Sequence, residues 1–185
     1  MVRAERRVAR HIPNVLTLLR VVVAPLVAVL ILAAEDTTSR WITLVVFVAA
    51  AVTDGIDGWF ARRFHVTSKF GAFIDPVADK LLILGAFGAF VVTGALPASV
   101  FIIVGARELL VTLLRLWLIK RHHVVMPASL WGKSKTVVQI VALSFYIAPV
   151  IPHLVAAATM SAAVALTVWS GVEYVYRARR LTRAS

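Results

Sequence analysis

The sequence predicts an all-α membrane protein with six transmembrane helices and both termini in the cytoplasm. Three observations predict it: 61% of the 185 residues are hydrophobic, they gather in long runs, and most charged residues lie between these runs. Soluble domains are about half apolar and about a quarter charged, whereas only 16% of this chain is charged. A basic nucleic-acid-binding protein would not contain repeated apolar runs of about 20 residues. We therefore expect the net charge of +11 to serve membrane orientation and contact with anionic membrane lipids, and we expect no nucleic-acid partner.

Six apolar segments are long enough to cross a bilayer, because a helix spans the hydrocarbon layer of about 30 Å with about 20 residues. Short stretches rich in charge, Gly or Pro separate the segments. The predicted spans are residues 14–34, 41–62, 70–93, 97–119, 131–149 and 154–176. They form one membrane domain, 14–176, between a basic juxtamembrane segment, 1–13, and a basic cytoplasmic tail, 177–185.

The distribution of Lys and Arg among the connections predicts the orientation. Basic residues gather before the first span, after the second, after the fourth and after the sixth, whereas the opposite connections contain only Arg40. Connections rich in Lys and Arg stay in the cytoplasm, so both termini are expected there. Residues 2–12 mix Arg with small apolar residues. This pattern suits either a short interfacial helix on the anionic inner leaflet or a disordered basic tail.

Four of the nine acidic residues lie within 26 consecutive residues, at the cytoplasmic ends of the second and third spans. Asp54 and Asp57 are three residues apart, and Asp75 and Asp79 are four apart, so each pair shares one helix face. In an antiparallel hairpin centred near residue 66 the two pairs would lie at equal depth. A carboxylate inside a span costs at least about 2.5 kcal/mol on insertion scales, so this cluster indicates a functional site.

Four converging carboxylates raise one another's pKa and cannot all remain ionised without cations. Oxygen-only ligation suits Mg²⁺ or Mn²⁺, and four Asp side chains can hold two divalent ions that also bind phosphate oxygens. A purely structural alternative is a set of salt bridges at the membrane edge. The cations available for such bridges are Arg62, Arg63, Lys69 and Lys80.

Residues 54–79 also match a longer pattern, Asp54-x2-Asp57-Gly58-x2-Ala61-Arg62-x8-Gly71-x3-Asp75-x3-Asp79. This pattern resembles the signature of the CDP-alcohol phosphotransferase family, and every specified position is present. The resemblance continues through residues 12–20, 106–108 and 131–136, so that with the six spans it covers essentially the whole chain.

The resemblance implies a transferase that uses CDP-diacylglycerol as donor and glycerol 3-phosphate as acceptor. It implies that Asp54, Asp57 and Asp75 are ligands of two divalent ions, and that Asp79 is either the general base for the attacking hydroxyl or a fourth ligand. It also implies a homodimer in a bacterial-type inner membrane, with the active site facing the cytoplasm. The residues expected to bind CDP-diacylglycerol are Gly58, Ala61, Arg62 and Gly71. Helix packing for Gly58 and Ala61, and membrane anchoring for Arg62, are the structural alternatives.

Glycerol 3-phosphate carries a dianionic phosphate, so a basic pocket is expected beside the metal site. The candidates are Arg107 and Arg115 in the fourth span and Lys133 and Lys135 at the start of the fifth. Glu108 is placed to orient or balance these cations. The two lysines also fit the positive-inside rule without any role in binding.

Two other functions remain open from the sequence. The same donor could serve another acceptor, inositol phosphate or phosphatidylglycerol. A more remote alternative is a cation carrier that uses the carboxylates as its transport site, because charged residues within spans occur there as well. A carrier needs access from both faces, whereas all four Asp residues cluster at one depth.

Overall fold

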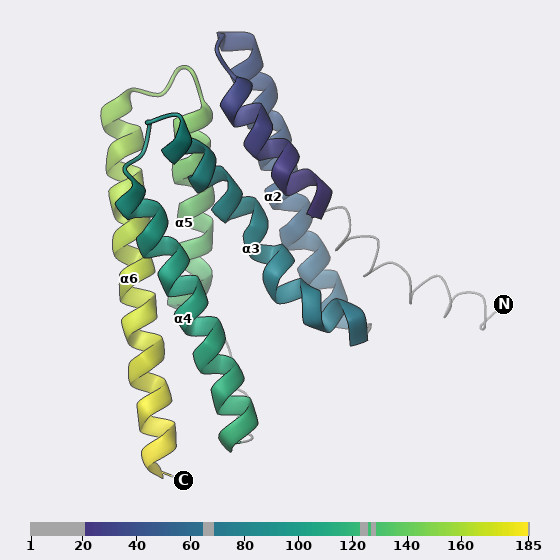
Figure 1. The fold of residues 1–185 in the computed structure, drawn as a ribbon, viewed down its shortest axis with the longest axis vertical. Helices are drawn as coiled ribbons and strands as arrows, with labels where there is room; N and C mark the ends of the chain where they lie inside the picture. Colours follow the sequence, from purple (N-terminus) through teal and green to yellow (C-terminus); the bar gives the residue numbers. More distant parts are fainter. Residues whose placement is uncertain (1–20, 65–68, 123–125, 127–128, 185) are drawn as a thin grey trace, which may run out of the picture. The chain divides into compact units, whose positions relative to one another are not determined.

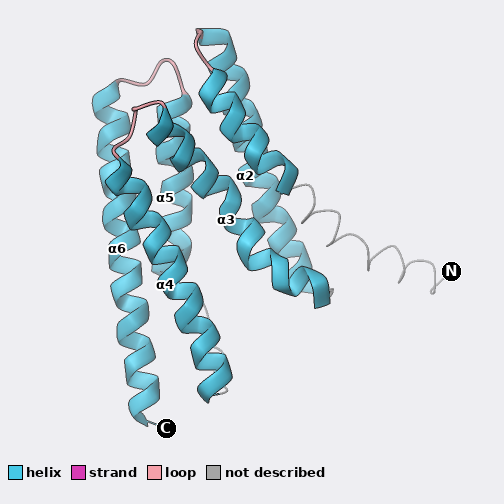
Figure 2. Cartoon of the chain, viewed as in Figure 1, coloured by secondary structure: helices cyan, strands magenta, loops and turns pink. Residues whose placement is uncertain are grey.

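The computed structural model describes residues 21–64, 69–122, 126 and 129–184, and for residues 54–64, 69–79, 122 and 183–184 it describes the backbone alone. These residues form helices joined by short connections, with no strand among them (Figure 2). The predicted all-α class is therefore confirmed for the part of the chain that is described. The helices are Val21–Ala33, α2 at Thr37–Phe64, α3 at Lys69–Val92, α4 at Ala98–His122, α5 at Leu130–Ile147 and α6 at His153–Ala184 (Figure 1).

Each helix coincides with one of the six predicted spans, but the ends differ. Helix α6 continues to Ala184, through residues that we assigned to the cytoplasmic tail. Within the described residues, one helix is long and apolar enough to cross a membrane by length and composition, namely His153–Thr182 of α6. Charged residues interrupt α4, and two lysines lower the hydropathy of α5. The six-span topology and the cytoplasmic termini stay predictions.

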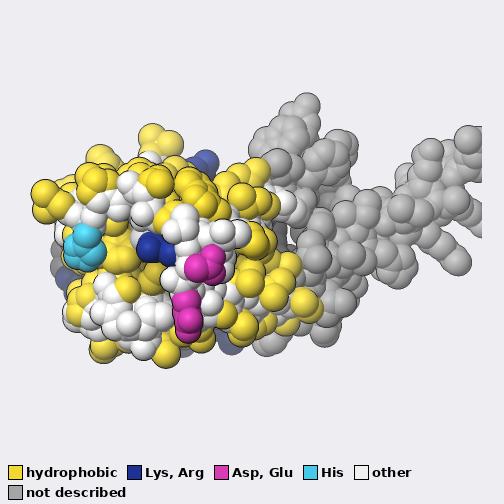
Figure 3. All heavy atoms as spheres, turned by 90° about the horizontal axis from the view of Figure 1, so that it is seen from above, with side chains coloured by type: hydrophobic (Ala, Val, Ile, Leu, Met, Phe, Trp, Pro, Cys, Tyr) yellow, Lys and Arg dark blue, Asp and Glu magenta, His cyan; other side chains and the backbone are white. Residues whose placement is uncertain are grey.

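Large hydrophobic side chains are exposed on every helix of the described part. Leu154 is 81% exposed, Leu130 79% and Val92 76%. Hydrophobic side chains cover much of the surface in the view of Figure 3. Soluble monomers rarely expose apolar surface so widely, whereas a helix surrounded by lipid does so along its length.

The chain divides into two compact units, Met1–Thr93 and Gly94–Ser185. In the first unit, Phe47 of α2 and Phe87 of α3 are fully buried. The helix Val21–Ala33 packs against α3 at Gly85, where an added Cβ would lie 3.7 Å from the carbonyl oxygen of Ala24. Small residues allow this close approach between helices, as is usual in membranes.

Helix α2 begins with a side-chain cap. The Oδ2 atom of Asp36 accepts hydrogen bonds from the backbone N–H groups of Thr38, at 2.9 Å, and Ser39, at 3.2 Å. The Oγ of Ser39 in turn accepts from the N–H of Asp36 at 3.2 Å. These bonds satisfy N–H groups in the first turn that have no partner within the helix.

In the second unit, α4 and α5 both pack on α6. Buried residues recur along α6 every three or four positions, which puts them on one stripe of the helix. Most have small side chains, so the neighbouring helices can lie close. The stripe consists of Ala156, Met160, Ala163, Thr167, Ser170, Tyr174 and Ala178. The connection from α3 to α4 turns at Gly94, whose φ of 74° is readily adopted only by glycine.

Candidate functional site

The four aspartates of the signature lie on two helices. Asp54 and Asp57 belong to α2, and Asp75 and Asp79 belong to α3, so the three- and four-residue spacings remain helical spacings. Each pair therefore lies along one side of its own helix. The side chains of all four lie outside the described residues, and their convergence stays a prediction.

The residues predicted to bind the donor belong to the same two helices. Gly58, Ala61 and Arg62 fall in α2, and Gly71 falls near the start of α3. Their side-chain surroundings also lie outside the described part of the chain. Their assignment continues to depend on the signature.

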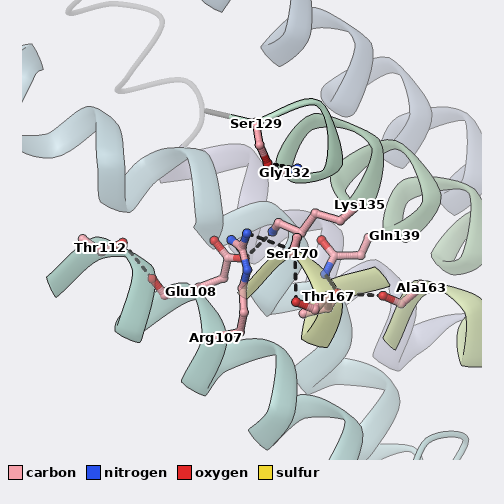
Figure 4. Close-up of polar contacts among 10 residues, drawn as sticks. All are labelled: Arg107, Glu108, Thr112, Ser129, Gly132, Lys135, Gln139, Ala163, Thr167 and Ser170. Carbon is pink, nitrogen blue, oxygen red and sulfur yellow. Dashed lines mark hydrogen bonds and ion pairs between the residues drawn. The ribbon is translucent and has the colours of Figure 1, made fainter. Parts of the chain in front are cut away.

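A buried ionic cluster joins α4 to α5 in the second unit (Figure 4). The Nη1 of Arg107 donates a hydrogen bond to Oε1 of Glu108 at 3.0 Å, and the Nζ of Lys135 donates to the same oxygen. The three side chains are 11%, 12% and 7% exposed, in the order Arg107, Glu108 and Lys135. Glu108 thus pairs with one cation from α4 and one from α5. This pairing agrees with the expectation that Glu108 balances the charge of these cations.

The cluster continues into α6 through a line of hydrogen bonds. The Nη2 of Arg107 donates to Oγ of Ser170 at 3.1 Å, and that hydroxyl donates to the carbonyl oxygen of Thr167 at 3.0 Å. From α5, the Nε2 of Gln139 donates to Oγ1 of Thr167 at 2.9 Å. Gln139, Thr167 and Ser170 are all at most 1% exposed. Buried polar groups that satisfy one another in this way fix the relative placement of the helices that carry them.

In the ionic cluster, Arg107 and Lys135 share the carboxylate of Glu108. The Nε of Arg107 is also buried and has no hydrogen-bond partner among the described residues. A buried N–H group without a partner is costly. The Nε–H of Arg107 is therefore a donor that an anionic ligand could accept from.

Gly171 allows the Arg107 side chain to lie against α6. A Cβ added at Gly171 would lie 3.1 Å from Cγ of Arg107 and 3.9 Å from its Nε. The first distance is shorter than a relaxed contact between carbon atoms, which is about 3.5 to 4.0 Å. The position of the guanidinium group thus depends on the absence of a side chain at residue 171.

The other two predicted acceptor residues are not part of this cluster. Arg115 of α4 and Lys133 of α5 are exposed. The start of α5 is held separately, because the Ser129 hydroxyl accepts from the N–H of Gly132 at 3.1 Å and donates to Glu173 of α6 at 2.6 Å. Of the four predicted cations, the structure brings together Arg107 and Lys135.

Gln139, Thr167 and Ser170 are not among the site residues predicted from the sequence. A signal was present, because Lys135 and Gln139 are four residues apart and the two hydroxyl residues are three apart, each pair within an apolar segment. Polar residues on one face of an apolar helix generally face other helices rather than lipid.

The family of the chain follows from comparison with known proteins. The family model described as CDP-alcohol phosphatidyltransferase matches residues 10–169, which include the complete aspartate signature and the buried ionic cluster. The chain therefore belongs to the CDP-alcohol phosphotransferase family, a family of membrane proteins, and is a transferase.

Named relatives resemble the chain over most of its length. A Mycobacterium tuberculosis protein named probable phosphatidylglycerophosphate synthase is 42% identical, and the matched region covers 92% of this chain and 82% of the relative. Proteins named CDP-diacylglycerol–glycerol-3-phosphate 3-phosphatidyltransferase, from Escherichia coli K12 and from Shigella flexneri, are each 37% identical, covering 91% of this chain and 95% of the relative.

Proposed function

We propose that this protein transfers the phosphatidyl group of CDP-diacylglycerol to glycerol 3-phosphate, forming phosphatidylglycerol phosphate and CMP. The names and coverage of the relatives support both substrates. The structural observation that supports binding of the acceptor is the buried cluster of Arg107, Glu108 and Lys135, which brings together an Arg and a Lys, the side chains that bind phosphate, and contains an unpartnered Nε–H of Arg107.

The donor half depends on the aspartate signature. Asp54, Asp57 and Asp75 offer only oxygen donors, which is the ligand chemistry that Mg²⁺ and Mn²⁺ prefer. Enzymes of this family are generally dependent on a divalent metal. Two divalent ions bound there would neutralise the charge on the diphosphate of the donor. Gly58, Ala61 and Gly71 would leave room for the nucleotide and diphosphate, and Arg62 would add a positive charge beside them.

The residues of the chain then position the reactants and move one proton. A hydroxyl oxygen of glycerol 3-phosphate attacks the β-phosphorus of CDP-diacylglycerol, and the bond from that phosphorus to the oxygen of CMP breaks. Asp79 accepts the proton of the attacking hydroxyl. Such a transfer depends mainly on positioning and charge neutralisation, and a positioned base typically adds a factor of about 10² to 10⁴.

Arg107 and Lys135 would hold the phosphate of the acceptor. Glu108 keeps both cations in place, and the line through Ser170, Thr167 and Gln139 fixes α4 and α5 against α6. Arg115 and Lys133 are exposed, so they would attract the anionic acceptor toward the site rather than contact it when it is bound.

We further propose that the chain crosses a bacterial inner membrane six times, with both termini and the active site on the cytoplasmic side, and that it forms a homodimer. The exposed apolar surface of each described helix supports insertion in a membrane. The concentration of Lys and Arg in alternate connections supports the orientation.

The experiment is CMP release by the full-length protein, purified in detergent micelles and supplied with CDP-diacylglycerol, Mg²⁺ and glycerol 3-phosphate. We expect release that requires the acceptor and falls at least about 100-fold in Asp79→Asn. Asp36→Asn is the matched control, because Asp36 is an exposed carboxylate outside the signature.

Inositol phosphate and phosphatidylglycerol serve as competing acceptors in the same assay. Faster CMP release with either compound would identify that compound, instead of glycerol 3-phosphate, as the acceptor. Divalent-ion uptake into vesicles without any CMP release would favour a carrier and would overturn the transferase proposal.

A further inference from the structure

An apolar groove of about 490 Å³ runs between the C-terminal halves of α4 and α6, which lie side by side in Figure 1. Its walls include exposed Leu110, Leu113 and Trp117 of α4, and the buried Ala178 of α6 also lines it. Arg179 and Thr182 supply its polar atoms on α6. The volume lies within the range of about 300 to 1,000 Å³ that is usual for small-molecule sites.

The groove is shorter than one leaflet. Its lining runs from Leu110 to Trp117 on α4 and from Val175 to Thr182 on α6, about 10 Å at helical rise, whereas half of the hydrocarbon layer is about 15 Å. The hydrogen bond between Arg107 and Ser170 sets the register of α4 and α6, and it places Arg179 close to the level of Trp117. In the membrane topology proposed above, on which this placement rests, the groove lies in the inner leaflet and is basic toward the cytoplasmic interface.

Arg179 is distinct from the two neighbouring arginines. Arg177 pairs with Glu173 at 3.6 Å, and the guanidinium of Arg180 lies 5.9 Å from the centre of the Tyr176 ring. Arg179 is exposed and forms no ion pair with any residue that the structure describes. The sequence contains no acidic residue after Glu173, so the field at this end of the groove is positive.

We propose that this groove binds a membrane phospholipid with an anionic head group, with one acyl chain between α4 and α6 and the phosphate on Arg179. Interfaces between membrane helices are enriched in Gly and Ala, whereas the exposed walls here are Leu and Trp, which suits a flexible acyl chain better than another helix. The site uses none of the residues assigned to the metal ions, donor or acceptor, and it does not depend on the proposed reaction.

The head group decides the selectivity of this site. An acyl chain gains little by moving from the bilayer into an apolar groove, because lipid tails are as apolar as the groove walls. A cation near an anionic membrane surface contributes about 1 kcal/mol, which is about fivefold in binding. The charge of Arg179 should therefore favour binding of anionic lipids over zwitterionic lipids. Changes in the groove walls should affect the binding of both kinds of lipid.

The test compares the wild-type protein with Arg179→Gln and Arg180→Gln, each purified in detergent and titrated with phosphatidylglycerol or phosphatidylcholine. The two variants lose the same charge at adjacent positions. Native mass spectrometry counts bound lipid, and thermal unfolding in the same detergent checks the fold. We expect the wild type and Arg180→Gln to retain phosphatidylglycerol about fivefold better than Arg179→Gln does, with phosphatidylcholine binding weakly to all three.

A second variant, Val175→Phe, places a larger side chain in the groove lining and should reduce retention of phosphatidylglycerol with Arg179 still present. Equal retention of the two lipids by the wild type, or equal losses in the two arginine variants, would overturn the proposal. A change of oligomeric state in Val175→Phe with unchanged lipid retention would assign the groove to a second copy of the chain instead.

Discussion

Gly171→Ala should selectively weaken use of the acceptor. In the structure, the added methyl group would lie 3.1 Å from Cγ of Arg107, so the side chain must shift by a few tenths of an ångström. That shift acts on the hydrogen bond of 3.1 Å between Arg107 and Ser170. Hydrogen bonds of charged groups contribute about 1.5 to 3 kcal/mol, so its loss corresponds to a decrease of about 10- to 100-fold in kcat/KM for glycerol 3-phosphate.

Gly105→Ala is the matched control, because a Cβ at Gly105 of α4 would meet no atom of the described residues within 4 Å. Both substitutions gain about 1 kcal/mol of helix propensity, so stability alone does not separate them. The assay is initial-rate CMP release over a range of glycerol 3-phosphate concentrations at saturating donor. Identical kcat/KM values for the two variants would refute the role of Arg107 in acceptor binding.

Three other substitutions test the ionic cluster, the cap of α2 and the core of the first unit. Glu108→Gln leaves two buried cations without their shared carboxylate, and breaking such a pair costs about 3 to 5 kcal/mol. Thermal unfolding in detergent should show a lower Tm, and glycerol 3-phosphate should raise this Tm more than it raises that of the wild type. An unchanged Tm would contradict the pairing. At Asp36, hydrogen bonding, first from the Ser39 side chain, holds the pKa below its ordinary value. This carboxylate therefore stabilises the fold above its unfolded-state pKa, and the stabilisation is lost as pH falls through its folded-state pKa. Asp36→Ala should lower the Tm at pH 7, and the Tm difference between wild type and variant should shrink in acid. A Tm difference that grew in acid would contradict the lowered pKa. Phe87→Ala empties a fully buried site and should cost about 3 to 5 kcal/mol, whereas Val92→Ala, at an exposed position, should change the Tm little in the same measurement.

The sequence predicted the helices well because length and apolar character alone define them. All six predicted spans contain a helix, and the connections fall near the charged, Gly and Pro stretches. The end of α6 was the clearest difference. The predicted span ends at residue 176, and the residues predicted as a basic cytoplasmic tail continue the helix to Ala184, because Arg, Ala and Leu are good helix formers.

The candidate site was predictable where charge was the signal. Arg107, Glu108 and Lys135 stand out in apolar segments, and the structure joins them. Gln139, Thr167 and Ser170 were missed because uncharged polar residues are common in membrane helices, and only the packing of α5 on α6 brings them together. Exposed Arg115 carries the same charge as Arg107 and lies eight residues further along α4, so charge alone did not distinguish the two positions.

Manganese binding tests most directly the claim that the signature aspartates form one divalent-ion site. Electron paramagnetic resonance of the full-length protein, titrated with Mn²⁺ in the presence of CDP-diacylglycerol, counts the bound ions. We predict two bound ions per chain in the wild type, a loss of binding in Asp75→Ala, and no change in Asp36→Asn. Absence of bound Mn²⁺ at saturation, or undiminished binding in Asp75→Ala, would contradict the account.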